Sequence, residues 1–260
     1  MKKFISNIKR YKSYMLFSVK SSLKADVATS RLNWLWWILN PLLFMLVYTF
    51  VSLVVFGKGE KYFPLFVFIG LNLWNFFSAC VNKSVRLVRK NKGTITKVYL
   101  PKYILIFNTM MEEGFKMCIA FLLVIVMIPI YHVHLTYRII FAIPVVLVHL
   151  LTTYAICSIV LNLGVYIDDL AHLISVLLRL MFYLSGIIYD ITTRVPEPYN
   201  KIMLYGNPVA LFVSGMRRCI LYEKKPSFKG LLIWAVVSAI VAVIGTRIIT
   251  KHENSYVKII

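Results

Sequence analysis

Acidic residues are scarce in this sequence. It has 10 Asp and Glu against 30 Lys and Arg, and charged residues make up only 15% of its 260 positions. With 60% hydrophobic residues and a mean hydropathy of +0.76, this composition excludes an ordinary soluble domain. The basic residues cluster at the edges of apolar runs, as retention signals and headgroup contacts do. We therefore expect a polytopic membrane protein in contact with membrane lipids, and no nucleic-acid partner.

Several chemical motifs are also missing. The four cysteines form no CxxC pair, so neither a disulfide framework nor a metal site is expected. No GxxxxGK[ST] sequence or other nucleotide cradle occurs, so the chain is not expected to bind or hydrolyse ATP. A lipid-modifying enzyme would need a His/Asp or multi-carboxylate cluster, which the adjacent Asp168 and Asp169 alone do not supply. We expect no catalytic residue, cofactor or metal, and no cleaved signal peptide.

Residues 1–30 predict an amphipathic helix that lies in the membrane interface. At 100° per residue an apolar arc faces a basic side, and its members are Phe4, Ile8, Tyr11, Met15 and Val19. The segment carries too many charges for a membrane span.

Six apolar runs follow and predict an all-α fold of six spans, because a hydrocarbon core of about 30 Å needs about 20 helical residues. They cover residues 34–56, 62–81, 103–130, 139–163, 173–189 and 231–247. Residues 83–102 are strongly basic, and translocating each Lys or Arg costs about 2.5–3.5 kcal/mol, so this loop is expected in the cytoplasm. By parity, both termini and the turn at Asp168 are then cytoplasmic.

The basic loop also carries a helical pattern. Gly93 breaks the chain, and Thr94 can cap a short helix whose Ile95, Val98 and Tyr99 share one face at i, i+3 and i+4. Such a helix suits contact with a soluble partner. The alternative is a basic loop held near anionic lipid headgroups.

Polar residues inside the spans leave further alternatives open. Asn72 and Asn75 lie on adjoining faces of the second span and can bond a neighbouring helix or line a polar path. Arg179, near the middle of the fifth span, is a functional candidate that should face protein or water. Pairing with Glu112 or Glu113 is the structural alternative, although these glutamates should lie nearer the cytoplasm. Asp168 and Asp169 can ligate a metal or, more simply, cap the following helix.

Residues 190–229 predict an extracytoplasmic re-entrant hairpin. Two apolar, helix-capable stretches are separated by Gly206-Asn207-Pro208, and re-entrant backbone must be buried in protein or line a cavity. Three basic side chains of this segment are expected to form an outer gate that meets a pyrophosphate or an anionic polymer: Arg194, Arg217 and Arg218.

Several motifs in this order resemble the membrane subunit of type-2 ABC exporters, and the resemblance covers nearly the whole chain. They are Arg31-Leu-Asn-Trp-Leu-Trp-Trp-Ile-Leu-Asn-Pro41, Lys97-Val-Tyr-Leu-Pro101, the acidic turn at Asp168 and Asp169, Phe182-Tyr-Leu-Ser-Gly-Ile-Ile-Tyr189, and Asn207-Pro208-Val-Ala-Leu with Arg217. The closest branch exports lipid-linked O-antigen, teichoic acid or capsule across the bacterial inner membrane. Gly186 is a departure, since many of these sequences have Pro there.

The resemblance implies a single permease domain over residues 1–260 that works as a homodimer, with a separate ATP- and Mg-binding ATPase beneath each subunit. It implies that the inner turns receive the ATPase, through Ile95, Val98, Tyr99, Asp168 and Asp169. It also implies that the first and fifth spans line the path of a lipid-linked glycan, with Tyr48, Phe182, Tyr183 and Tyr189 as channel residues beside Arg179. Aromatic faces suit sugar rings, although lipid contact and helix packing explain such rings equally well. The alternative function is a small-molecule or drug exporter of the same architecture.

Overall fold

The computed structural model describes residues 2–28, 31–55 and 60–259 and is helical, without strands, over these ranges. The expected all-α fold is thus confirmed. The longer helices are α1 (Lys2–Arg10), α2 (Lys12–Val27), α3 (Trp36–Phe50), α4 (Phe63–Val85), α7 (Lys102–Ile130), α8 (Ala142–Tyr166), α9 (Leu170–Leu184), α12 (Pro208–Ile220) and α13 (Phe228–Ile259). The shorter ones are η1 (Asn33–Leu35), η2 (Val51–Val55), α5 (Leu87–Lys90), α6 (Lys92–Ile95), η3 (Tyr137–Phe141), α10 (Ile191–Arg194) and α11 (Tyr199–Gly206).

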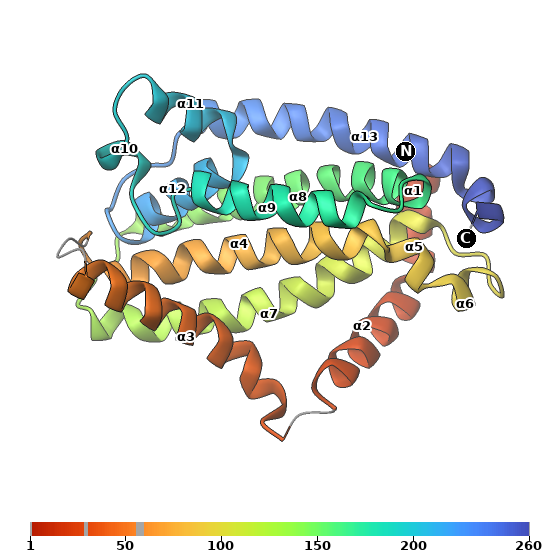
Figure 1. The fold of residues 1–260 in the computed structure, drawn as a ribbon, viewed down its shortest axis with the longest axis horizontal. Coiled ribbons are helices and arrows are strands. Elements are labelled where there is room, and N and C mark those ends of the chain that lie inside the picture. The colour runs from red at the N-terminus through yellow and green to blue at the C-terminus, as the bar shows by residue number, and fades with distance from the viewer. Residues whose placement is uncertain (1, 29–30, 56–59, 260) are drawn as a thin grey trace.

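Helix α4 forms the centre of the bundle. It contacts α3, α7, α8, α9 and α12, and its residues 65–69 have no exposed surface. The long helices run along the longest axis of the molecule, with α5 and α6 at one end and α10 to α12 at the other (Figure 1). Both chain ends lie toward the α5–α6 end (Figure 1). The molecule therefore has one end built from basic loops and one built from the segment that follows α9.

Among the described residues, five helical segments are long and apolar enough to cross a membrane: Trp36–Val54, Phe63–Val85, Lys102–Ile130, Tyr137–Tyr166 and Phe228–Glu253. The protein is accordingly a multi-pass membrane protein. Phe56, at the end of the first expected span, lies outside the described residues. Helix α7 is 29 residues long, or about 43 Å at ~1.5 Å per residue, so it exceeds a hydrocarbon core of about 30 Å. Its first turns project toward the α5–α6 end.

The expected fifth span, residues 173–189, corresponds to the shorter helix α9. Its 15 residues reach only about 22 Å, at ~1.5 Å per residue. The helix cannot continue to Tyr189 because Gly186 has a φ of +62°, in the left-handed region that favours glycine. A Cβ at Gly186 would also lie 2.5 Å from Cγ1 of Ile191. The six-span count thus remains a prediction.

The N-terminal segment forms two helices, α1 and α2, joined at Tyr11, where one was expected. Met15 and Val19 of the predicted apolar arc are buried, while residues 1, 29 and 30 and the side chain of Phe4 lie outside the described part. Figure 1 shows α2 leading away from the α5–α6 end. Helix α2 lies alongside the first half of α7, where Asn108 Nδ2 donates a hydrogen bond to Ser18 Oγ at 3.3 Å. An interfacial position for this segment stays a prediction.

Helices α4 and α8 approach each other closely at Gly164. A Cβ built on Gly164 would lie 2.0 Å from the backbone oxygen of Val85, a distance that no real Cβ tolerates. The neighbour here is backbone at the end of α4, so a flexible side chain cannot simply move aside. Small residues allow such close helix contacts in membranes.

Replacing Gly164 with alanine is therefore expected to destabilise the protein by at least the ~1–3 kcal/mol typical of overpacking. Thermal unfolding of the purified protein measures the effect. Gly206→Ala is the matched control, since nothing lies within 4 Å of a Cβ at Gly206. An unchanged Tm for Gly164→Ala would show that α4 and α8 separate easily at this point.

Residues 190–229 contain the helices α10, α11 and α12 and the start of α13. As expected, the chain breaks at Asn207, which caps α12 by accepting hydrogen bonds at Oδ1 from the backbone N–H groups of Val209 and Ala210. Pro208 occupies the first turn of α12, where its missing N–H costs nothing. Helix α12 packs against α4 and α8. Whether this segment enters the membrane as a re-entrant hairpin stays a prediction.

Candidate functional site

The expected helix carrying Ile95, Val98 and Tyr99 on one face is not present. Helix α6 begins at Lys92, two residues before the predicted cap, and ends at Ile95, so Val98 and Tyr99 follow it in a turn. Ile95 is 5% exposed and belongs to the core, whereas Val98 and Tyr99 are 59% and 58% exposed. The pattern was misleading because Ile95 anchors the loop to the bundle. Only the other two side chains face outward from the α5–α6 end.

Tyr99 ties the two ends of the chain to this turn. Its hydroxyl donates to Glu253 Oε1 of α13 at 2.8 Å, and its carbonyl accepts from the Tyr11 hydroxyl at 3.1 Å. The hydrogen bond to Glu253, with partial burial, raises the pKa of Tyr99 to about 12. The phenol therefore stays protonated at physiological pH. A displacement of this turn would therefore act on α13 through Glu253 and on the N-terminal helices through Tyr11.

The acidic turn meets the basic loop. Asp168 forms an ion pair with Arg89 of α5, and Arg89 Nη2 also donates to the carbonyl of Val165 at 3.2 Å. Sequence reasoning missed Arg89, because 76 residues separate it from Val165 and no local pattern joins them. Asp169 occupies the N-cap position of α9, but its side chain makes no capping hydrogen bond. Within the described ranges, no group of three His, Cys, Asp or Glu is placed to hold a metal ion.

The predicted channel aromatics come together across three helices. The Phe182 ring of α9 lies 6.1 Å from the Tyr48 ring of α3 and 5.6 Å from the Trp74 ring of α4. Tyr183 follows at 5.4 Å and is 65% exposed. The Tyr189 hydroxyl donates to the Tyr183 carbonyl at 2.8 Å, which fixes the turn after α9. Trp74 was missed because its position on α4 gave no sign that it faces α9. The name aromatic cluster is used for five residues: Tyr48, Trp74, Phe182, Tyr183 and Tyr189.

Arg179 is exposed on α9, and no ion pair with another described residue is formed. The considered pairing with Glu112 or Glu113 is absent, because both carboxylates bind Lys83 instead, at 2.5 and 2.7 Å. Arg179 lies one helical turn before Tyr183, on the same side of α9. A cation thus stands beside the aromatic cluster on the outside of the subunit.

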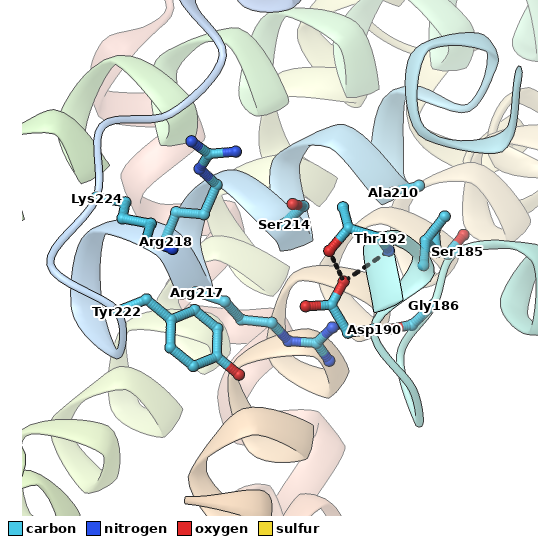
Figure 2. A pocket seen from close by; sticks show the side chains of 11 residues that line it. Ser185, Gly186, Asp190, Thr192, Ala210, Ser214, Arg217, Arg218, Tyr222 and Lys224 are labelled. Atoms are coloured by element: carbon cyan, nitrogen blue, oxygen red, sulfur yellow. Dashed lines mark hydrogen bonds between the residues drawn. The ribbon is translucent and has the colours of Figure 1, made fainter. Parts of the chain in front are cut away.

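The three predicted gate residues have different surroundings. Arg194 pairs with Glu60 at 3.2 Å, and Arg218 Nε donates to the carbonyl of Lys225 at 3.0 Å. A cavity of about 100 Å³ lies beside Arg218. Figure 2 shows Asp190 on one side of this cavity, with Tyr222, Arg218 and Lys224 on the other. Asp190 caps α10 through hydrogen bonds from Thr192. Burial raises the pKa of Tyr222 to about 12.

Arg217 is buried, at 4% exposure, although it was predicted as an outer gate residue. Its guanidinium donates from Nε to Phe66 O at 3.0 Å, from Nη1 to Gly186 O at 2.7 Å and from Nη2 to Ile187 O at 2.6 Å. It therefore joins α12, α4 and the turn after α9. These bonds leave it unavailable as an exposed gate in this conformation, because its donors are aimed at backbone carbonyls.

Arg217→Met is expected to lower the Tm, because each buried carbonyl left without its donor costs about 1–3 kcal/mol. Removing a buried charge recovers part of that cost, and the three broken bonds outweigh it. Arg218→Met is the matched control, since the adjacent guanidinium donates to the Lys225 carbonyl in an exposed hydrogen bond. The Tm values of both variants are measured by thermal unfolding and compared with that of the wild type. Equal Tm values would contradict the structural role of Arg217.

Comparison with known proteins places these features in a family context. Residues 15–221 match the family described as ABC-2 type transporter. The chain is 27% identical over 256 residues to the O-antigen export system permease protein RfbA of Myxococcus xanthus, covering 98% of each chain. It is 25% identical over 239 residues to a protein of the same name from Klebsiella pneumoniae, covering 92% of this chain and 91% of that one.

Proposed function

Because this chain belongs to the ABC-2 type transporter family, we propose that it is the membrane subunit of an ATP-driven polysaccharide exporter. Its cargo is a lipid-linked glycan of the O-antigen, teichoic acid or capsule type, and the barrier is the bacterial inner membrane. The observation that carries the proposal is the extent of the match. The M. xanthus relative named as an O-antigen export permease aligns over 98% of both chains. The two proteins therefore correspond throughout, and not in one shared segment.

The exporter is proposed to be a homodimer with two separate ATPase subunits. The sequence has no nucleotide cradle of its own, so the energy must come from a partner. A bundle with five clear spans has too few helices to enclose a wide path alone, and a symmetric pair is the economical solution. The basic loop and both termini are proposed to lie in the cytoplasm, where Val98, Tyr99 and the Asp168–Arg89 pair would meet the ATPase.

The aromatic cluster is the proposed path. Sugar rings present C–H groups that stack on aromatic faces, and tyrosine hydroxyls can bond sugar oxygens. Tyr48 belongs to the first expected span and Tyr183 to the fifth. The Phe182 ring contacts both rings and so joins the two spans. The exposed position of Tyr183 and Arg179 suits an interface between two subunits, with the path running between them.

Deletion of the gene in its own host tests the function. The expected result is loss of one surface polysaccharide and accumulation of its lipid-linked form inside the cell. Restoration by the wild-type gene is the control. Unchanged surface glycan, together with increased sensitivity to small toxic compounds, would contradict the proposal and favour the small-molecule exporter.

A further inference from the structure

A second, larger cavity of about 400 Å³ lies between α3, α4 and α7. Its size falls within the ~300–1,000 Å³ typical of ligand sites. Four asparagines from two helices line it: Asn40 on α3 and Asn72, Asn75 and Asn82 on α4. Each amide supplies two donors and one acceptor. Asn72 is buried at the inner wall of the cavity, whereas Asn40, Asn75 and Asn82 are exposed at its open side.

The side-chain amide of Asn72 keeps an unused donor in the described structure. The residue is 3% exposed, and its Nδ2 has no hydrogen-bond partner in the described part of the chain. A buried donor without a partner costs about 1–3 kcal/mol. Asn72 also lines the cavity, but its Nδ2 is shielded from solvent, so a ligand oxygen there would bond it only after the amide turns toward the cavity.

The charges around the cavity argue against an anionic ligand. Lys116 bonds Asp26 at 2.6 Å and Glu113 at 3.2 Å, and Lys83 bonds Glu113 and Glu112. Of these charged residues, Glu113 and Lys116 line the cavity. The Lys116 ammonium is already paired, so a phosphate would find no free cation at the wall and would have to break these ion pairs. An uncharged ligand with many hydroxyl groups fits the amides without this penalty.

Aromatic side chains form the remaining wall. Trp36, Trp37 and Phe44 of α3 line the cavity opposite the asparagines of α4. Amides that bond hydroxyl groups, opposite ring faces that stack on C–H groups, are the chemistry of sugar recognition. Phe44 also stacks on Tyr48 with ring centroids 6.3 Å apart, so a residue of the cavity wall contacts the aromatic cluster.

We propose that the cavity between α3, α4 and α7 is a binding site for an uncharged sugar residue, located before the aromatic cluster on the path. The proposal rests on the proposed function, since the sugar is taken to belong to the exported glycan. The sugar can arrive as the headgroup of a glycolipid or as part of a water-soluble chain. The same side chains recognise it in both cases.

Binding is measurable without transport. The full chain, as it assembles when purified, is placed in phosphatidylcholine nanodiscs free of sugar detergents, and its tryptophan fluorescence is recorded. One arm adds neutral di- and trisaccharides of glucose, galactose, mannose and N-acetylglucosamine. The other arm includes glucosyl- and galactosyl-diacylglycerol in the disc, with phosphatidylglycerol as the anionic comparison. Saturable binding of the free saccharides would show that the site accepts a soluble sugar chain. Saturable binding of the glycolipids alone would show that it accepts a lipid headgroup.

Two variants locate the site. Asn72→Leu and Asn75→Ala are each expected to weaken sugar binding at least tenfold, whereas Asn200→Ala on α11, far along the chain from the cavity, should not. Asn72→Leu should also leave the Tm unchanged or higher, because it removes a donor that has no partner. A lower Tm with unchanged binding would assign Asn72 to packing and contradict the site.

Other outcomes also overturn the inference. They are no response to any sugar, equal binding of phosphatidylglycerol, or cross-linking of Asn75→Cys to a second copy that fills the cavity. Sugar binding that persists in a protein shown to export drugs would refute the proposed function and leave the site intact. Glycan export without sugar binding in the cavity would refute the site and leave the proposed function intact.

Discussion

Replacing both Val98 and Tyr99 with aspartate is expected to abolish export while ATP hydrolysis by the assembled complex continues. The two side chains are the exposed apolar residues of the turn after α6, so they are the proposed contact with the ATPase. Placing carboxylates in an apolar contact costs several kcal/mol, because they lose their water without gaining partners. The basic side chains nearby matter less, since exposed ion pairs contribute only about 0–1 kcal/mol.

A conservative double variant serves as the control. Val98→Leu with Tyr99→Phe keeps the apolar surface but removes the hydrogen bond to Glu253. It should export normally if packed contact transmits the motion, and poorly if the tie to α13 does so. Export and ATPase rates of reconstituted complexes are compared with wild type. Normal export by the aspartate variant would remove this turn from the coupling mechanism.

The second large effect is expected at the aromatic cluster. Changing Tyr183 and Tyr189 to alanine should reduce glycan export about tenfold or more, because two rings proposed to stack on the sugar are lost. Assembly and basal ATPase activity should persist. Surface glycan and ATP hydrolysis are the measurements. Arg179→Gln should also reduce export, since a free cation beside the rings suits an anionic lipid headgroup.

Two controls separate the path from structure. Tyr189→Phe removes the hydrogen bond to the Tyr183 carbonyl but keeps the ring, so export should fall little. Tyr137→Ala removes a ring that is 70% exposed elsewhere on the surface, and no effect is expected. Wild-type export from both the double tyrosine variant and Arg179→Gln would contradict the path and favour a small-molecule cargo.

The helices were largely predictable because apolar runs must cross the membrane as helices. The end of α9 was not, since only the backbone conformation of Gly186 shows that the helix stops before Tyr189. In the basic loop, i, i+3, i+4 spacing grouped Ile95 with Val98 and Tyr99, but spacing does not reveal where a short helix ends. Tertiary contact decided that Ile95 is buried.

The candidate sites were predictable only in part. The aromatics of α9 stand together in the sequence, whereas Trp74 joins them through packing alone. Arg217 resembled a surface cation, yet its three carbonyl partners come from two other parts of the chain. The sequence left Asn72 and Asn75 open between contact with a neighbouring helix and a polar path, and both residues line the cavity between α3, α4 and α7. Long-range partners of this kind leave no local pattern.

One measurement tests the central claim most directly: ATP-dependent movement of a lipid-linked glycan across a sealed vesicle containing only this chain and its partner ATPase. The account predicts that the glycan becomes accessible to an externally added, impermeant glycosidase on the side opposite the ATPase. It also predicts that this movement stops when ATP is omitted or when the permease is left out. Glycan that stays protected while the same vesicles transport a small dye with ATP would contradict the account.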